Sequence, residues 1–182
     1  TYSLDYCVKK ILSYKKIMKY LSESMSLSSI SRIFNTTVET ISNRIEKLSR
    51  QVVYYHEYLK SHIRLEEDLT SDGFESFVKS QYFPNNIHLL GGKDSQYLYF
   101  FNYVFLKRKG RMTDYQKKRR NKLYKHVKYE KGALSKSFSE VIDEFFNLVN
   151  TNNRHVSLYT DMKPEYSAVY KNHFLYKYYE NI

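Results

Sequence analysis

A short stretch near the carboxyl end of the chain, LYTDMKPEY (residues 158–166), decides the fold. Its apolar residues run into a lone carboxylate, Asp161, and Pro164 then marks the start of a predicted helix. An earlier stretch, LTSDGFESF (69–77), also carries an aspartate, Asp72, inside an alternating pattern typical of a strand. The arrangement of these two strands therefore determines whether the two aspartates meet.

Residues 64–182 predict a mixed α/β domain. Three extended stretches divided by turn residues such as GGKDS come first, and a helical section, a fourth strand and a last helix follow (strands 65–78, 86–92, 95–107 and 155–161; last helix 165–179). A strand that is reached through a helical crossover lies parallel to its partner. If the fourth strand pairs with the first, Asp72 and Asp161 come to lie side by side.

Two capping signatures divide the helical section. Thr113 with Gln116 forms a capping box before a basic helix, and Ser137 with Glu140 forms another before VIDEFFNLV. We therefore expect two helices between the third and fourth strands, each beginning at its cap.

A pair of neighbouring aspartates predicts a site for a divalent cation. Two carboxylates at close range repel each other, and Mg²⁺ or Mn²⁺ bound by oxygen ligands relieves that repulsion. Such an ion can activate water and stabilise a leaving 3′ oxygen in phosphodiester chemistry. Each aspartate taken alone is more often a surface or turn residue, so the prediction depends on the pairing of the two strands.

Residues 1–63 predict an all-α segment with a helix-turn-helix. Ser26 opens a short helix, Asn35 suits a left-handed turn, and Thr36 or Thr37 can cap the following helix. The apolar residues recur at steps of three and four, so we expect these side chains to pack inward: Leu27, Ile30, Ile33, Phe34, Val38, Ile41 and Ile45. Any three-helix bundle can produce the same pattern, so a purely structural role stays an alternative.

The second helix of that motif is the expected reader of DNA. Amide side chains suit adenine, and guanidinium groups suit guanine or phosphate. The exposed positions of its first turns are the predicted contacts: Thr40, Asn43 and Arg44. No Gly or Pro ends this helix before about residue 63, so it could link two domains, pair with a second copy of the chain, or pack against the following domain.

Positive charge is concentrated in one window. The chain carries a formal net charge of +11, and residues 107–131 hold twelve Lys or Arg against Asp114 and Glu130, which places ten of the eleven net charges there. A local surface of this kind favours a phosphate backbone as partner, although a solvated helix face is the simpler alternative. The predicted DNA contacts in the window are Arg108, Lys109, Arg111, Lys117, Lys118, Arg119 and Arg120.

The overall composition excludes two classes of protein. One cysteine, Cys7, rules out a disulfide scaffold, and no apolar run approaches the length of a membrane span. We therefore expect a soluble, intracellular protein with no membrane partner.

Several motifs occur in one order along the chain: DGFESF, SQYFPNNIHLL, GKDSQYLYFFNYVFLKRKGRMT, QKKRR and TDMKPEY. In this order they resemble the catalytic region of bacterial insertion-sequence transposases with an RNase H-like fold and a DDE triad. The distinctive elements of that family, LRRKGRMT before a basic helix and TDEHPAY, correspond here to residues 106–113 and 160–166. The resemblance extends from about residue 66 to 170, and the upstream helix-turn-helix also matches.

The resemblance implies an RNase H-like mixed sheet with flanking helices (64–182), preceded by a helix-turn-helix segment (1–63). It implies that Asp72 and Asp161 are the first two catalytic carboxylates and bind Mg²⁺ or Mn²⁺, and that the activity is DNA strand cleavage and transfer. It also implies that the protein works in the bacterial cytoplasm at the nucleoid. A homo-oligomer stays an open alternative to a single copy of the chain.

Two departures from the family pattern qualify this expectation. Many such transposases carry a cysteine-rich zinc ribbon before the helix-turn-helix, and one cysteine cannot build a zinc site. Glu180 follows Asp161 too closely to be the third carboxylate. We therefore expect a fragment or decayed copy, incomplete at the carboxyl end, with weak or no strand transfer. The alternatives are a non-catalytic helix-turn-helix DNA-binding protein and a structure-specific nuclease on the same fold.

Overall fold

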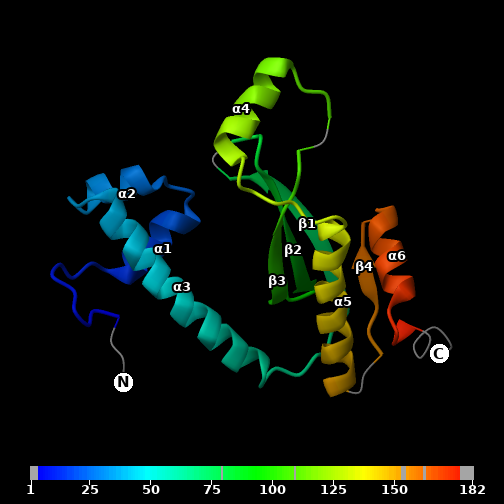
Figure 1. Ribbon diagram of the computed structural model, residues 1–182. Helices are drawn as coiled ribbons and strands as arrows, with labels where there is room; N and C mark the ends of the chain where they lie inside the picture. Colours follow the sequence, from blue (N-terminus) through cyan, green and yellow to red (C-terminus); the bar gives the residue numbers. More distant parts are fainter. Residues whose placement is uncertain (1–3, 79, 109, 153–154, 162, 177–182) are drawn as a thin grey trace. The chain divides into compact units, whose positions relative to one another are not determined.

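The computed structural model describes residues 4–78, 80–108, 110–152, 155–161 and 163–176. The chain divides into two compact units, Thr1–Ile63 and Arg64–Ile182, whose elements are labelled in Figure 1. Within the described ranges, no helix is long and apolar enough to cross a membrane.

The first unit consists of three helices, each begun by a side-chain cap: α1 (Tyr14–Ser22), α2 (Leu27–Ile33) and α3 (Val38–Lys60). Ser26 and Thr37 accept hydrogen bonds from the backbone amides of the third helical residues, as predicted, and satisfy donors that the helix leaves free. Asn35 adopts the predicted left-handed conformation, with φ of 51°. The helices enclose a small core made by Leu12, Ile17, Ile30 and Ile41.

Two residues that the helical pattern assigned to this core lie outside it. Ile33 is 50% exposed and Val38 is 42% exposed, so the prediction that they pack inward is wrong. The core is small, and the apolar residues beside its four members, such as Phe34 and Ile45, are only partly buried. The buried stripe is therefore narrower than the periodicity suggests.

A four-stranded sheet forms the centre of the second unit, with strands β1 (Leu69–Phe77), β2 (Pro84–Gly92), β3 (Leu98–Phe105) and β4 (Leu158–Thr160). Its order is β3-β2-β1-β4. The first three strands are antiparallel neighbours, and β4 pairs with β1 in parallel. The predicted parallel orientation of the fourth strand is therefore confirmed, and its partner is the first strand.

Three helices accompany the sheet: α4 (Asp114–Tyr124), α5 (Ala133–Asn152) and α6 (Pro164–Asn172). The long helix α5 lies along one face of the sheet and contacts α6, so the fold is mixed α/β (Figure 1). Its apolar side supplies most of the core, including Phe138, Val141, Ile142 and Phe146.

The helix α4 begins as its capping box predicts, whereas α5 does not. Thr113 and Gln116 exchange both hydrogen bonds of the box. The predicted box at Ser137 is wrong, because α5 starts at Ala133 and Ser137 is buried inside it. The Ser137 hydroxyl bonds to the sheet instead of to the backbone of its own helix.

The other face of the sheet carries exposed apolar side chains. Side chains alternate between the two faces of a strand, and those of Asp72, Phe74 and Tyr103 lie on the side opposite to the buried His88. Phe74 is 60% and Tyr103 is 63% exposed. Asp72 therefore stands on the open face of the sheet.

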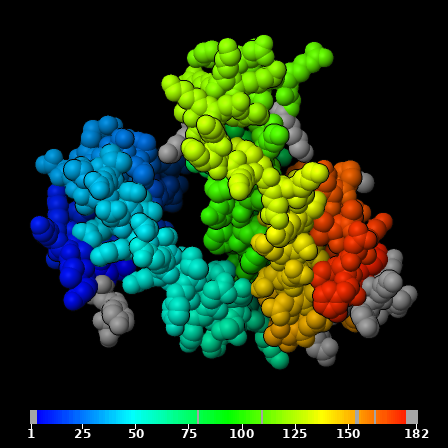
Figure 2. All heavy atoms as spheres, in the orientation of Figure 1, coloured from blue at the N-terminus to red at the C-terminus, as the bar shows by residue number. Residues whose placement is uncertain are grey.

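An aromatic cluster attaches α4 to the sheet. The ring of Phe83 stacks on Phe105 at 4.7 Å and on Tyr124 at 4.9 Å, and the Tyr124 hydroxyl lies 2.8 Å from the hydroxyl of Ser80. No residue of α4 is buried. The segment around α4 forms a lobe that stands out from the sheet, as Figure 2 shows in yellow-green.

Candidate functional site

The pairing of β1 with β4 places Asp72 and Asp161 at equivalent positions. The last registered pair of the two parallel strands is Ser71 with Thr160, and each aspartate is the next residue of its chain. Parallel strands lie about 4.8 Å apart, so residues in register are neighbours across the sheet. Asp72 and Asp161 are both exposed at this position.

The two carboxylates have different partners. An Asp72 oxygen accepts a hydrogen bond of 2.6 Å from the backbone amide of Gly73. An Asp161 oxygen forms an ion pair with the Lys163 ammonium at 3.1 Å. The same ammonium lies 5.1 Å from the centre of the Tyr166 ring. Among the described residues, Asp161 thus pairs with the Lys163 ammonium, and Asp72 accepts from the backbone of its neighbour Gly73.

A buried polar chain lies beneath Lys163. The Tyr166 hydroxyl lies 3.0 Å from Nε2 of His88, and Nδ1 of His88 lies 3.0 Å from the hydroxyl of Ser137. Ser137 donates to Oδ1 of Asn102 at 2.9 Å, and the Asn102 amide donates to Glu140 at 2.8 Å. Strand β2, strand β3 and helices α5 and α6 each contribute to this chain.

The directions of these hydrogen bonds follow from the number of protons. Ser137 has one hydroxyl proton, which it donates to Asn102, so it accepts from Nδ1–H of His88. Nε2 of a neutral His88 is then free to accept the Tyr166 hydroxyl proton. Burial lowers the pKa of His88, which keeps the imidazole neutral and the chain of bonds intact.

The pKa of the Tyr166 hydroxyl responds to its burial and to the charges around it. Burial raises this pKa most, Lys163 opposes the rise, and the charges of Asp161 and Asp72 raise it further. Partial burial works to lower the pKa of Lys163, but the bond to Asp161 and the neighbouring Tyr166 outweigh it and leave the pKa above its ordinary value. The charges of Asp72, Asp161 and Lys163 therefore all act on the phenol of Tyr166.

The donor set fits a hydrated divalent ion held by two carboxylates. Within the described part of the chain, no group of three or more His, Cys, Asp or Glu side chains could enclose a metal ion. Mg²⁺ commonly keeps several waters and binds proteins through one or two carboxylates together with substrate phosphates. Asp72 and Asp161 could supply that pair of oxygen ligands, and the remaining positions would belong to water and phosphate.

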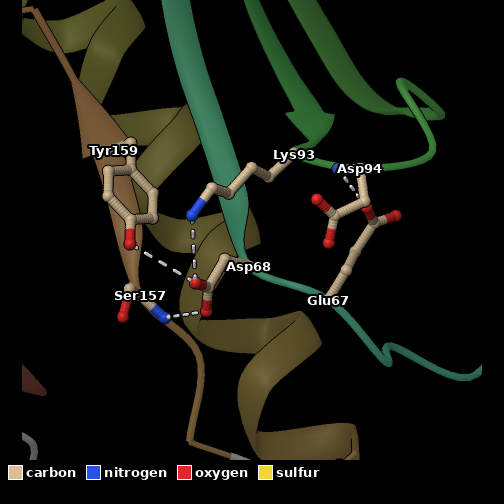
Figure 3. A network of polar contacts seen from close by, with 6 residues as sticks. All are labelled: Glu67, Asp68, Lys93, Asp94, Ser157 and Tyr159. Atoms are coloured by element: carbon tan, nitrogen blue, oxygen red, sulfur yellow. Dashed lines mark hydrogen bonds and ion pairs between the residues drawn. The ribbon is translucent and has the colours of Figure 1, made fainter.

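The acidic residues before β1 have a structural role. Asp68 accepts from the Ser157 amide at 3.0 Å and lies 3.8 Å from the Lys93 ammonium, as Figure 3 shows. Glu67 accepts from the backbone amides of Asp94 and Ser95 and from the Ser95 hydroxyl. The two carboxylates thus fasten the β2–β3 turn and the start of β4 at the end of the strands away from Asp72.

The basic window is an exposed surface with one anchored member. Helix α4 presents Lys117, Lys118 and Arg119 to solvent, with Arg120 half-buried. Arg108 is also half-buried and lies over the ring of Tyr82 at 5.2 Å, whereas Arg111 is exposed. Lys109 falls outside the described residues, as does Glu180.

The predicted DNA contacts of the first unit divide into two groups. Asn43 is exposed near the start of α3, and Thr40 is half-buried with its hydroxyl 2.9 Å from that of the capping Thr37. Arg44 is only 8% exposed, and its guanidinium donates to the Lys10 carbonyl at 3.0 Å. The expectation of an exposed Arg44 is therefore wrong, because the arginine ties α3 to the segment before α1.

Sequence reasoning missed Lys163 and the His88–Tyr166 pair. Lys163 and Tyr166 stand in the sequence only as members of the motif TDMKPEY, and His88 only as a member of SQYFPNNIHLL. His88 and Tyr166 are 78 positions apart in the sequence, so no local pattern could have joined them. Comparison of the chain with family models, with curated proteins and with solved structures found no match.

Proposed function

We propose that the chain is a transposase-type DNA-binding protein whose second unit is an RNase H-like domain that cleaves and joins DNA strands by the DDE mechanism. The observation that carries the proposal is the parallel pairing of β4 with β1, whose last registered pair, Ser71 with Thr160, stands directly before Asp72 and Asp161. Two like-charged carboxylates on adjacent strands repel each other, and a divalent cation bound by both relieves that repulsion. The motifs that resemble insertion-sequence transposases include both aspartates.

The residues of the chain would divide the chemistry as follows. Asp72 and Asp161 would hold Mg²⁺ or Mn²⁺, which when bound supplies Lewis acidity for attack on a DNA phosphate and for the departing 3′ oxygen. Asp72 stands on the open face of the sheet, so a nucleic acid can approach it. The buried bonds of Tyr166 keep α6, and with it the residues after β4, in a fixed orientation.

The charge distribution supports DNA as the partner. Lys117, Lys118 and Arg119 project from a helix without a buried residue, so their ammonium and guanidinium groups are free of any role in the core. Phosphate contacts of this kind supply sequence-independent affinity. Asn43, exposed on α3, remains the candidate for reading base edges in a helix-turn-helix.

A second candidate function is DNA binding without catalysis. It is favoured by the shortage of acidic ligands, since the described residues contain no cluster of three that could hold a metal. In this alternative the helix-turn-helix and the basic window bind DNA, and the sheet has a supporting role. Only the catalytic function requires a divalent ion at Asp72 and Asp161, so metal binding separates the two.

The deciding experiment measures Mn²⁺ binding by electron paramagnetic resonance, which counts the free ion, on the full chain and on Asp72→Asn and Asp161→Asn. Asp114→Asn is the matched control, because Asp114 is an exposed aspartate on α4. We expect each of the first two variants to lose at least tenfold in affinity and the control to keep the affinity of the parent. Equal binding by all four proteins would refute the catalytic function and leave the DNA-binding alternative.

A further inference from the structure

Lys163 occupies a position that is electrostatically unfavourable for a lysine. It is the N-cap residue of α6, at the positive end of the helix dipole, where acidic side chains are favoured and cations are not. Its side chain makes no capping hydrogen bond, unlike the side chain of Thr113 at the start of α4. Capping therefore does not explain why a lysine stands at this position. The contacts of its ammonium group do.

Those contacts hold the Lys163 ammonium in one position. Asp161 lies 3.1 Å from the ammonium, and the side chains of the pair are only 34% and 38% exposed. The Tyr166 ring beneath the ammonium stacks on Phe138 at 3.9 Å and is 1% exposed. Because the ring is also fixed through its hydroxyl by His88, the lysine has a rigid surface to rest on.

The ammonium therefore neutralises one of the two carboxylates that a divalent ion would need. We propose that Lys163 is an internal counter-ion that holds Asp161 until a divalent cation, binding between Asp72 and Asp161, displaces it. This inference rests on the proposed function and adds regulation of the same site. A cation of double charge that reaches both aspartates attracts them more strongly than one ammonium paired with Asp161 alone. The flexible four-carbon stem of lysine allows the ammonium to leave without movement of the backbone.

The displacement weakens metal binding, because the ion pair must be broken first. Ion pairs with this degree of exposure have small net energies, so the expected effect is correspondingly modest. Replacement of Lys163 by a neutral residue should tighten Mn²⁺ binding by about twofold to fivefold. Lys163→Arg keeps the positive charge and should bind Mn²⁺ no more tightly than the parent chain.

The test is a Mn²⁺ titration of the full chain, followed by electron paramagnetic resonance, with Lys163→Gln and Lys163→Arg. Lys163→Met is a second neutral variant that keeps the aliphatic stem over Tyr166, and it replaces Lys163→Gln if circular dichroism finds that variant unfolded. Lys171→Gln is the matched control, because it removes one exposed charge from the other end of the same helix. Tighter binding by the neutral Lys163 variants and unchanged binding by Lys171→Gln would support the counter-ion.

The results separate a failure of this inference from a failure of the proposed function. If Asp161→Asn abolishes binding while the neutral Lys163 variants bind equally or more weakly than the parent, Lys163 is no competitor and only the inference falls. An equal gain in Lys171→Gln would mean that general charge is responsible, which also overturns it. If Asp161→Asn leaves binding unchanged, the metal lies elsewhere and both proposals fall.

Discussion

Replacement of Gly73 by alanine should disrupt the buried contacts under the candidate site. A Cβ atom at Gly73 would lie 2.5 Å from the Tyr166 hydroxyl and 3.1 Å from both polar atoms of the Asn86 amide. Real Cβ atoms do not approach an oxygen so closely, so one of these groups must move. Tyr166 has little room to do so, because its ring stacks on Phe138 and its hydroxyl bonds to His88.

The expected cost follows from two contributions. Overpacking of a close-packed interior costs about 1–3 kcal/mol. Loss of the Tyr166–His88 hydrogen bond leaves a buried acceptor unsatisfied, at a further cost of about 1–3 kcal/mol. We therefore expect Gly73→Ala to destabilise the sheet by about 2–6 kcal/mol. Gly91→Ala should be nearly neutral, because a Cβ atom there would meet the Tyr97 carbonyl at 3.5 Å and the Thr70 hydroxyl at 4.0 Å, which are both ordinary contacts.

Amide hydrogen exchange followed by mass spectrometry reads the stability of this sheet separately from that of the first unit. In peptides from β1 and β2, Gly73→Ala should lower protection by about 30-fold or more at 1.36 kcal/mol per tenfold change. In a Tyr166→Phe background, which lacks the hydroxyl, the same substitution should cost much less. Equal costs in both backgrounds, or a Gly73→Ala chain as protected as Gly91→Ala, would refute this reasoning.

Three further predictions concern pH and DNA. Burial lowers the pKa of His88 in the folded chain, so the unfolded chain binds more protons than the folded chain below about pH 6.5. The free energy of unfolding of the sheet should therefore fall as the pH decreases from there. His88→Asn should reduce this dependence of the free energy on pH, measured by urea unfolding at several pH values. Neutralising residues 117–119 together should reduce the slope of log affinity against log salt for duplex DNA by up to about 2.7, measured by fluorescence anisotropy, and an unchanged slope would exclude them as phosphate contacts. Asn43→Ala should weaken DNA binding without loss of thermal stability, whereas Arg44→Met should lower thermal stability, because Arg44 is buried and bonded to the Lys10 carbonyl; the opposite pattern would reverse these roles.

Local chemistry was predictable from the sequence where neighbouring residues decide it. The caps at Ser26, Thr37 and Thr113 each depend on residues within three positions, and all three are present. The parallel pairing of the fourth strand was also predictable, because a helical crossover leaves little choice of direction.

Long-range partners were not predictable. Ser137 has the spacing of a capping box with Glu140, but its hydroxyl is hydrogen-bonded to His88, 49 residues away. Arg44 has the spacing of an exposed recognition residue, but it bonds to a carbonyl 34 residues away. Periodicity predicts the face of a helix on which a residue lies. It does not predict which polar group of a distant segment will hydrogen-bond to that residue.

The same limit explains why the candidate site and the core cannot be separated. The two aspartates follow from strand pairing, which the sequence predicts, but the ammonium that holds Asp161 rests on a ring whose hydroxyl belongs to a buried chain of bonds. A buried polar chain is stabilising only while every member keeps its partner. A change at His88 therefore reaches Asp161 through Tyr166 and Lys163 without touching either carboxylate, so metal affinity and the protection of β1 should vary together in His88 variants.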